Sequence, residues 1–187
     1  IIGSFQKDGD GWGNGNNPKM IKGPDIFIKT VEILKNKIPE LFVLLSGPSR
    51  GYIKNNLIKL NIPFMHLNFS KYLDLIELYK CIDVYLICSR EEGGPRAIME
   101  SFASKTPLVT TNVGQAIDMV KNNFNAFKSS DINAEMLADL IFSKVYNKDN
   151  KLEEIINNAY ITAKNNSYEN QISLWKNFFD FEEVYKR

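Results

Sequence analysis

Short apolar runs alternate with amphipathic segments along the first two thirds of the chain. Each run is only a few residues long and almost entirely apolar, which is typical of strands whose two faces are both covered by helices. The runs lie at 1–5, 41–46, 64–67, 83–88 and 107–111, with a weaker sixth at 125–128.

The segments between these runs have helical periodicity. Phe27, Val31 and Leu34 fall on one helix face, and Pro24 stands where such a helix would begin. A second set repeats the spacing at Tyr72, Leu75, Ile76 and Tyr79. From about Ala134 onward the pattern is helical only, and we expect those helices to pack across one edge of the sheet or onto a partner domain.

Repetition of strand, helix and strand predicts an α/β fold with a doubly wound, Rossmann-like parallel sheet of about six strands, followed by C-terminal helices. The chain has 187 residues, 44% of them hydrophobic, which suits one domain. Its net charge of +1 gives no electrostatic argument for a nucleic-acid partner. The apolar runs are far shorter than the roughly 20 residues of a membrane helix.

Two further features bear on context. The chain opens on Ile1 without a Met, so we expect it to be part of something longer. Cys81 and Cys88 lie in apolar surroundings without C-x-x-C spacing, and we expect buried free thiols in a reducing, cytoplasmic setting.

Ten of the eleven glycines follow the carboxyl ends of the predicted strands, and Gly3 lies within the first strand. In open α/β sheets, ligands bind outside these strand ends. Glycine there permits positive φ and lets backbone N–H groups approach an anion. Tight strand-to-helix turns are the alternative reason for such glycines, and we favour a binding edge.

The stretch "EEGGPRAIMESF" at 91–102 places one carboxylate in a loop and a second in the helix behind it. Glu92 precedes the Gly93-Gly94 turn, Pro95 is suited to the first helical position, and Glu100 lies about a turn and a half into the helix. The helix N-terminus offers free N–H groups and a positive dipole end to a phosphate. An ordinary surface helix with an Arg96–Glu100 pair is the alternative.

The longer stretch "SREEGGPRAIMESFASKTPLVTTNVG" resembles the E-x7-E motif of the large retaining glycosyltransferase family with the GT-B fold, the group 1 or family 4 type. "IGSF…IKGPDIFIKTVEIL", "LFVLLSGPS" and "LIELYKCIDVYLICS" resemble other motifs of the same family, in the same order. The resemblance extends over nearly all of the chain. It implies that residues 1–187 form the C-terminal, nucleotide-sugar-binding domain, one half of a GT-B fold, without the N-terminal acceptor domain.

The resemblance also implies roles for individual residues. Glu92 would contact hydroxyls of the donor sugar, and Lys22 would neutralise the diphosphate, so both are expected to be catalytic. Glu100 would bind the ribose hydroxyls. Backbone N–H groups near the helix start would cap the outer phosphate, at Gly93, Gly94, Arg96 and Ala97. A lysine and a helix N-terminus stabilise a leaving diphosphate without a metal, so no metal or other cofactor is expected.

One departure from the family pattern affects the phosphate site. Ser4 follows Gly3 where the family usually has an Arg, and Gln6, Lys7 or Arg50 could take over its contact. The sequence does not choose among these three residues. We predict that Ser4, Gln6 and Arg50 bind the donor. Gly47 in the second glycine turn and Asn68, where the family's nucleobase usually lies, complete the predicted site.

The glycine-rich segment "KDGDGWGNGNNPK" at 7–19 matches neither a dinucleotide-binding loop nor a calcium loop, because the third glycine of the former and the final Glu of the latter are missing. We expect a flexible loop over the donor phosphates. A mobile surface insertion is the alternative, and Trp12 argues against it, because a Trp in such a loop usually packs on something. His66 is the only histidine, and we expect it to be a packed or surface residue.

We therefore expect a hexosyltransferase-type glycosyltransferase that transfers a sugar from a nucleoside diphosphate with retention of configuration, inactive as the isolated domain. An acceptor glycan or lipid-linked sugar would reach it through the other domain, as would any membrane contact of this cytoplasmic protein. The alternatives are an epimerase or phosphorylase of the same fold, or a non-catalytic nucleotide-binding or scaffolding module.

Overall fold

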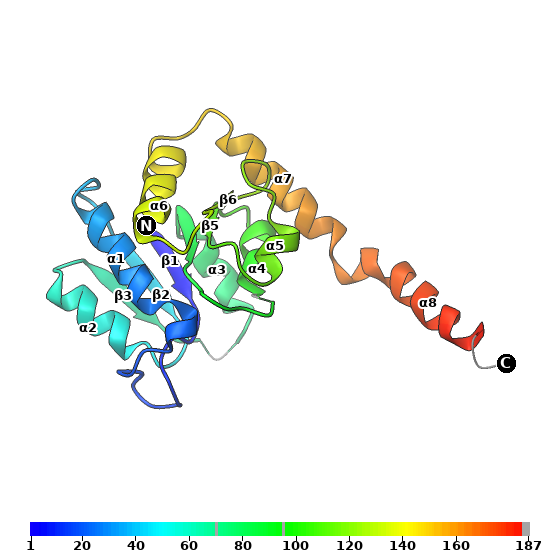
Figure 1. The fold of residues 1–187 in the computed structure, drawn as a ribbon, viewed down its shortest axis with the longest axis horizontal. Coiled ribbons are helices and arrows are strands. Elements are labelled where there is room, and N and C mark those ends of the chain that lie inside the picture. Colours follow the sequence, from blue (N-terminus) through cyan, green and yellow to red (C-terminus); the bar gives the residue numbers. More distant parts are fainter. Residues whose placement is uncertain (70, 95, 185–187) are drawn as a thin grey trace.

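The structure is a computed structural model that describes residues 1–69, 71–94 and 96–184. The predicted helix-initiating role of Pro95 lies outside the described residues. The strands form one sheet in which every neighbouring pair is parallel, in the order β3-β2-β1-β4-β5-β6 (Figure 1). Their bounds are β1 (Ile2–Phe5), β2 (Val43–Ser46), β3 (Phe64–Leu67), β4 (Val84–Ile87), β5 (Leu108–Thr110) and β6 (Phe127–Lys128). The predicted doubly wound, Rossmann-like α/β fold is confirmed, including the weak sixth strand.

Helices connect the strands and cover both faces of the sheet. The first part of the chain contains η1 (Met20–Lys22), α1 (Pro24–Lys35), α2 (Gly51–Lys59), α3 (Asp74–Lys80), α4 (Arg96–Ala103) and α5 (Gln115–Met119). The last part contains α6 (Ala134–Leu140), the π-helical η2 (Ile141–Tyr146), α7 (Leu152–Asn165) and α8 (Tyr168–Val184). In the described part of the chain, no helix is both long and apolar enough to cross a membrane.

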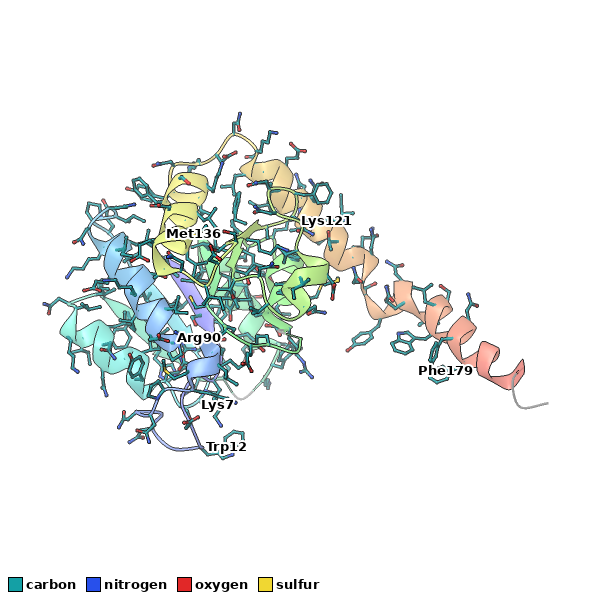
Figure 2. The ribbon with its side chains drawn as sticks, in the orientation of Figure 1. Lys7, Trp12, Arg90, Lys121, Met136 and Phe179 are labelled. Atoms are coloured by element: carbon teal, nitrogen blue, oxygen red, sulfur yellow. The ribbon has the colours of Figure 1, made fainter. Side chains whose placement is uncertain are left out.

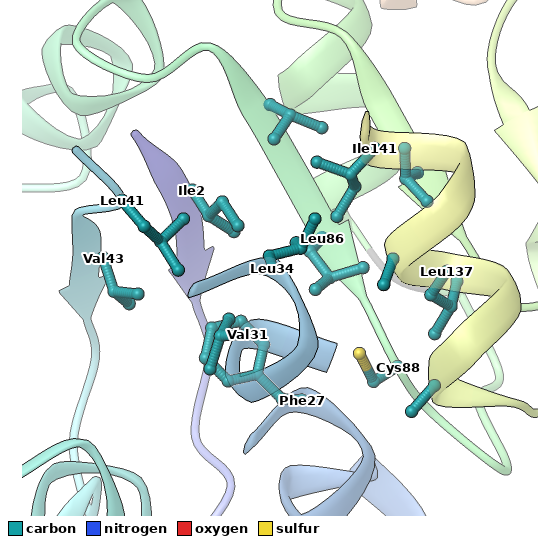
Figure 3. Close-up of a cluster of buried hydrophobic side chains, with 14 of the residues drawn as sticks. Ile2, Phe27, Val31, Leu34, Leu41, Val43, Leu86, Cys88, Leu137 and Ile141 are labelled. Atoms are coloured by element: carbon teal, nitrogen blue, oxygen red, sulfur yellow. The ribbon is translucent and has the colours of Figure 1, made fainter. Parts of the chain in front are cut away.

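The periodic apolar face of α1 forms the core on one side of the sheet (Figure 3). Val31 and Leu34 are completely buried, and they pack with Ile2 of β1 and Leu86 of β4. Burying such a side chain contributes about 1.5–3 kcal/mol. Truncating Leu34 to Ala would cost about 2–5 kcal/mol, because a cavity would remain beneath the helix.

A second cluster fills the opposite face of the sheet, between the strands and the helices α3 and α4. Ile98 and Phe102 of α4 are completely buried, as their shared helix face predicts. This packing fixes the rotation of α4 about its axis and therefore the direction in which Glu100 points.

The C-terminal helices begin at Ala134 as expected, but the prediction that they cross an edge of the sheet is wrong. α6 packs against α1, and α7 packs against α4, so these two helices extend the layers over the faces. α8 projects away from the body (Figure 1). Its Trp175, Phe178 and Phe179 contact one another and are more than half exposed.

The cysteine prediction is correct for one residue and wrong for the other. Both thiols are free, and Cys88 at the end of β4 is buried, which raises the pKa of its thiol well above the usual range. Cys81 is exposed, because it caps the C-terminal end of α3, where its thiol donates to the carbonyl of Glu77 at 3.2 Å.

Candidate functional site

The order of the sheet creates a switch point between β1 and β4. From β1 the chain proceeds to β2 and β3 on one side, and it then returns to place β4 on the other side. The connections that leave the carboxyl ends of these two strands therefore diverge, and in open α/β sheets such a switch point is where ligands bind. Lys22 lies in the connection after β1, and Glu92 lies in the connection after β4.

Lys22 and Glu92 meet at this point. The Lys22 ammonium forms an ion pair with Glu92 Oε1, and the Ser89 hydroxyl donates to the same oxygen at 3.0 Å. The side chains of Lys22 and Glu92 are 24% and 9% exposed, so both groups are partly desolvated and still accessible to solvent. The structure thus brings together the two residues predicted to be catalytic, although nothing in it tests their roles.

Gly23 allows Lys22 to approach β4 this closely. It has a positive φ of 64°, and a Cβ atom at this position would lie 1.9 Å from the carbonyl oxygen of Cys88. Only a residue without a side chain fits between η1 and the end of β4. Glycine at position 23 is therefore a geometric requirement of this turn.

Arg90, in the loop after β4, also holds this turn in place through hydrogen bonds. The sequence analysis did not predict this role. Its backbone N–H donates to the carbonyl of Ile21 at 2.7 Å, and its guanidinium donates to the carbonyl of Met20 at 2.8 Å. The guanidinium also makes two bonds of 2.7 Å to Asp25 at the start of α1. This bidentate pair lowers the pKa of Asp25 and holds η1 against the loop that carries Glu92.

Glu92 is supported through its backbone as well. Gly114, at the turn after β5, has a φ of 54°, and a Cβ atom there would lie 2.0 Å from the carbonyl oxygen of Glu92. Thr111 adds a further tie, because its hydroxyl donates to the carbonyl of Ser89 at 2.7 Å. Three neighbouring strands, β1, β4 and β5, thus contribute to one site.

Glu100 lies on α4 and is half-buried. Its carboxylate accepts a hydrogen bond from the Tyr79 hydroxyl at 2.9 Å and a second from the Tyr72 hydroxyl. Burial, with Glu100 nearby, raises the pKa of Tyr72 to about 12 and that of Tyr79 well above the usual range, so both phenols remain donors at neutral pH. The two tyrosines, in place of Arg96, are the partners of this carboxylate.

The predicted phosphate-capping segment lies at the start of α4. Gly93, Gly94 and Arg96 are exposed, and Ala97 is half-buried. A Cβ atom on Gly93 would meet nothing within 4 Å, so the backbone here faces open space. An anion can therefore approach this segment, as the prediction requires, but no bound anion tests it.

Ser4 and Arg50, both predicted to contact the donor, are buried at the carboxyl ends of β1 and β2. The Arg50 guanidinium donates to Ser4 Oγ at 3.0 Å and to the carbonyls of Gln6 at 2.5 Å and Ser46 at 3.3 Å. It also lies 3.2 Å from Asp8 Oδ2, and both side chains of this ion pair are at most 1% exposed. The charge of Arg50 is thus paired with Asp8 inside the protein. Its contact with a phosphate stays a prediction.

Burial dominates the electrostatics of this pair. It raises the pKa of Asp8 from 3.8 to about 6, although Arg50 acts in the opposite direction. Among the described residues, Asp8 Oδ1 and Arg50 Nε are buried atoms without a hydrogen-bond partner.

The segment at 7–19 folds back on itself and packs against the start of α2. Asp10 N–H donates to Asn17 at 2.9 Å, and Gly51 N–H donates to Asn14 at 2.7 Å. Gly15, with φ of 72°, approaches Ser49 so closely that a Cβ atom would lie 2.0 Å from its carbonyl oxygen. These bonds do not support the expectation of a loose flexible loop.

Trp12 stands at the tip of this segment, 86% exposed, with the Lys7 ammonium 4.0 Å from its ring centre (Figure 2). Beneath it lies a polar cavity of about 640 Å³ that Asn68 and His66 also line. His66 Nε2 lies 2.8 Å from the carbonyl oxygen of Gly47, so the histidine is a packed residue, as expected. Gly47 itself has a φ of 97° and allows the end of β1 to pass close by.

Among the residues described, no group of three or more His, Cys, Asp or Glu side chains is placed to hold a metal ion. The expectation that the protein needs no metal stays a prediction.

The fold and the site define a Rossmann-like α/β domain with a Lys22–Glu92 ion pair at its switch point. The protein family described as "Glycosyl transferases group 1" matches residues 16–162, which is most of the chain. The chain therefore belongs to the group 1 glycosyl transferases.

Individual proteins resemble the chain in sequence or in fold. Protein CapJ of Staphylococcus aureus is 28% identical over 160 residues, which cover 82% of this chain and 40% of CapJ. The crystal structure of a glycosyltransferase from Rickettsia africae superimposes with a TM-score of 0.75 at 24% identity, covering 100% of this chain and 48% of that one. The Anabaena protein Alr3699/HepE, solved in complex with UDP, gives a TM-score of 0.68 at 21% identity, with 87% and 43% covered.

These structural neighbours have the GT-B fold, so the predicted fold type is confirmed at the level of architecture. The chain spans less than half the length of each of these three relatives.

Proposed function

We propose that residues 1–187 are the donor-binding half of a retaining hexosyltransferase and that they hold a nucleoside-diphosphate sugar at the β1–β4 switch point. The observation that carries this proposal is the Lys22–Glu92 ion pair at the carboxyl ends of the two strands. Without ligand, each charge neutralises the other. A bound diphosphate would form an ion pair with the Lys22 ammonium, and the sugar hydroxyls would donate hydrogen bonds to the Glu92 carboxylate.

The chemistry of transfer fits this arrangement. The bond between the anomeric carbon and the diphosphate oxygen breaks, so negative charge grows on the leaving diphosphate. Lys22 and the exposed backbone at the start of α4 would stabilise that charge. Glu92 would orient the sugar, and Glu100 would accept hydrogen bonds from the ribose hydroxyls. The oxygen of an acceptor hydroxyl would bond to the anomeric carbon on the face that the diphosphate leaves, and its proton would pass to the departing diphosphate oxygen, so the configuration would be retained.

The other parts of the proposal depend on the rest of the protein. The acceptor would bind to a further domain, since the relatives are more than twice as long as this chain. Any membrane contact of this cytoplasmic protein would be made by that domain as well. Membership of the group 1 family favours a transferase over an epimerase, a phosphorylase or a scaffolding module.

Titration of the 187-residue chain with UDP, GDP and ADP by calorimetry tests the proposal. The account predicts measurable binding of one of them and no sugar transfer by this chain alone. Donor hydrolysis and the anomeric configuration of the product, followed by NMR on the whole protein, test transfer and retention. Binding of none of the three nucleotides, or a product of inverted configuration, would contradict the proposal.

A further inference from the structure

Both oxygens of the Glu100 carboxylate are occupied by tyrosine hydroxyls from one short stretch of chain. Tyr79, in α3, donates to Oε2 at 2.9 Å, and Tyr72, just before α3, donates to Oε1. The two tyrosines differ sharply in burial, because Tyr79 is 1% exposed and Tyr72 is 58% exposed. One partner of the carboxylate is thus a core residue, and the other is a surface residue.

Tyr79 is fixed by aromatic packing on the sheet. Its ring meets Phe5 of β1 edge-on at 5.0 Å between centres, and it lies 5.1 Å from the ring of Tyr85 on β4. Tyr85 is itself tied to β1, because its hydroxyl accepts the backbone N–H of Phe5 at 3.0 Å. The Tyr79 hydroxyl is therefore held at a set position relative to β1 and β4, and its bond to Oε2 restricts the orientation of the Glu100 carboxylate.

Tyr72 is held much less firmly. It precedes the helical residues of α3, and its ring lines the open side of a cavity of about 470 Å³ between α3 and α4. Rotation of this exposed side chain would free Oε1 without disturbing the core. A ribose hydroxyl that reached Glu100 would be a donor of the same kind as the Tyr72 phenol, so the two would compete for that oxygen.

We propose that Tyr79 is a positioning residue for Glu100 and that Tyr72 is a displaceable donor which occupies, in the free protein, the carboxylate oxygen that the nucleotide ribose takes. This inference rests on the proposed function, because it needs Glu100 to face the ribose. The two hydroxyls then have opposite effects on affinity. The Tyr79 hydroxyl strengthens binding by keeping Glu100 oriented. The Tyr72 hydroxyl weakens binding by stabilising the state in which it occupies Oε1 of Glu100.

The sizes of the two effects follow from ordinary hydrogen-bond strengths. A bond of ordinary strength between Tyr72 and Glu100 would leave Oε1 free in only a minor fraction of the molecules, so removing the bond would tighten binding about three- to tenfold. Loss of the Tyr79 bond, which is buried and made to a charged group, would weaken binding by about tenfold or more.

The test compares Tyr72→Phe, Tyr79→Phe and the control Tyr146→Phe, which lies at the far end of η2. Each variant and the parent chain are titrated by calorimetry with UDP, GDP and ADP, and the tightest of these is then compared with its 2′,3′-dideoxy analogue. We expect Tyr72→Phe to bind the ribonucleotide more tightly, Tyr79→Phe to bind it more weakly, and Tyr146→Phe to match the parent. With the dideoxy analogue, all four proteins should bind with the same affinity.

Each alternative result has a definite meaning. Unchanged or weaker binding by Tyr72→Phe would overturn the displaceable-donor inference. Equal effects on the ribonucleotide and its dideoxy analogue would show that the tyrosines act on folding instead of on the contact with the ribose. If the parent binds none of the three nucleotides, the proposed function fails, and this inference fails with it.

Discussion

Arg50 and Asp8 form an ion pair inside the protein, at a distance of 3.2 Å, where neither side chain is more than 1% exposed. The pair joins the end of β2 to the first residues of the glycine-rich segment, because Arg50 is the N-cap residue of α2 and Asp8 directly precedes the bridge between Gly9 and Pro18. A buried ion pair is costly to break from one side only, since the remaining charge has no partner. This segment is therefore anchored at its base, although its tip with Trp12 is open to solvent.

Replacing Arg50 with Leu should destabilise the protein by about 3–5 kcal/mol, because Asp8 would remain buried without a counter-charge. The double replacement Asp8→Leu with Arg50→Leu should be more stable than Arg50→Leu by at least about 1 kcal/mol. Urea unfolding measures both, with the exposed Arg96→Leu as the control. If Arg50→Leu unfolds like the parent and only weakens nucleotide binding, Arg50 is a ligand contact and the structural role is wrong.

The same pair predicts an unusual dependence of stability on pH. Because burial raises the pKa of Asp8 to about 6, the folded protein binds a proton between pH 4 and pH 6 that the unfolded chain has already released. This contribution to stability is complete below about pH 4 and is lost as the pH rises through about 6. Relative to Asp8→Asn, the parent should lose about 2 kcal/mol of unfolding free energy between pH 4 and pH 7. Parallel urea curves for the two proteins, with the same difference at every pH, would contradict it.

Gly23 offers a direct test of how Lys22 is positioned. Gly23→Ala should cost about 2 kcal/mol or more, because the new methyl group would collide with the carbonyl of Cys88 at a positive φ. The same variant should bind nucleotide more weakly, since Lys22 would be pushed away from Glu92. Gly13→Ala is the matched control, because a Cβ atom there meets nothing within 4 Å. Thermal melts and calorimetry measure both quantities, and equal results for the two variants would show that the turn does not depend on Gly23.

The apolar runs predicted the strands, since a buried parallel strand must be apolar on both faces. The resemblance to the family and the rule that strand ends share one edge of the sheet predicted that Lys22 and Glu92 lie at the same edge, but not that they form an ion pair. The partners of other residues left no local trace in the sequence. Asp8 and Arg50 are surrounded by glycine and polar residues, and nothing in that composition indicates that both would be buried. Tyr72 and Tyr79 could be placed on one helix face, but periodicity cannot show that Glu100 lies opposite them.

The edge packing expected for the C-terminal helices failed for a similar reason. Helical periodicity reveals an apolar face but not the surface that covers it. The surface that α6 covers lies on α1, and the surface that α7 covers lies on α4. The exposure of Cys81 depends on where α3 ends, which is the least predictable property of a helix.

The two glutamates should respond differently to the same isosteric change. Glu100→Gln should weaken binding of the free nucleotide and of the nucleotide sugar alike, by about tenfold, because the ribose is common to both. Glu92→Gln should leave binding of the free nucleotide close to that of the parent, and it should lower the additional affinity that the sugar provides and the turnover of the whole protein. Paired calorimetry and steady-state kinetics measure these effects, with thermal melts as the folding control. If both variants behave like the parent, the two carboxylates have structural roles only and do not contact the donor.

The central claim is that Lys22 receives the diphosphate at the β1–β4 switch point, and one calorimetric comparison tests it most directly. Lys22→Ala and the control Lys29→Ala, on the exposed face of α1, are titrated with the nucleoside diphosphate and with the corresponding nucleoside. The account predicts that Lys22→Ala loses about 10- to 100-fold in affinity for the diphosphate, the equivalent of a charge-assisted contact of about 1.5–3 kcal/mol, and little for the nucleoside. Lys29→Ala should match the parent with both ligands. Equal losses by Lys22→Ala for the diphosphate and the nucleoside would show that Lys22 does not touch the phosphates, and the proposed site would be wrong.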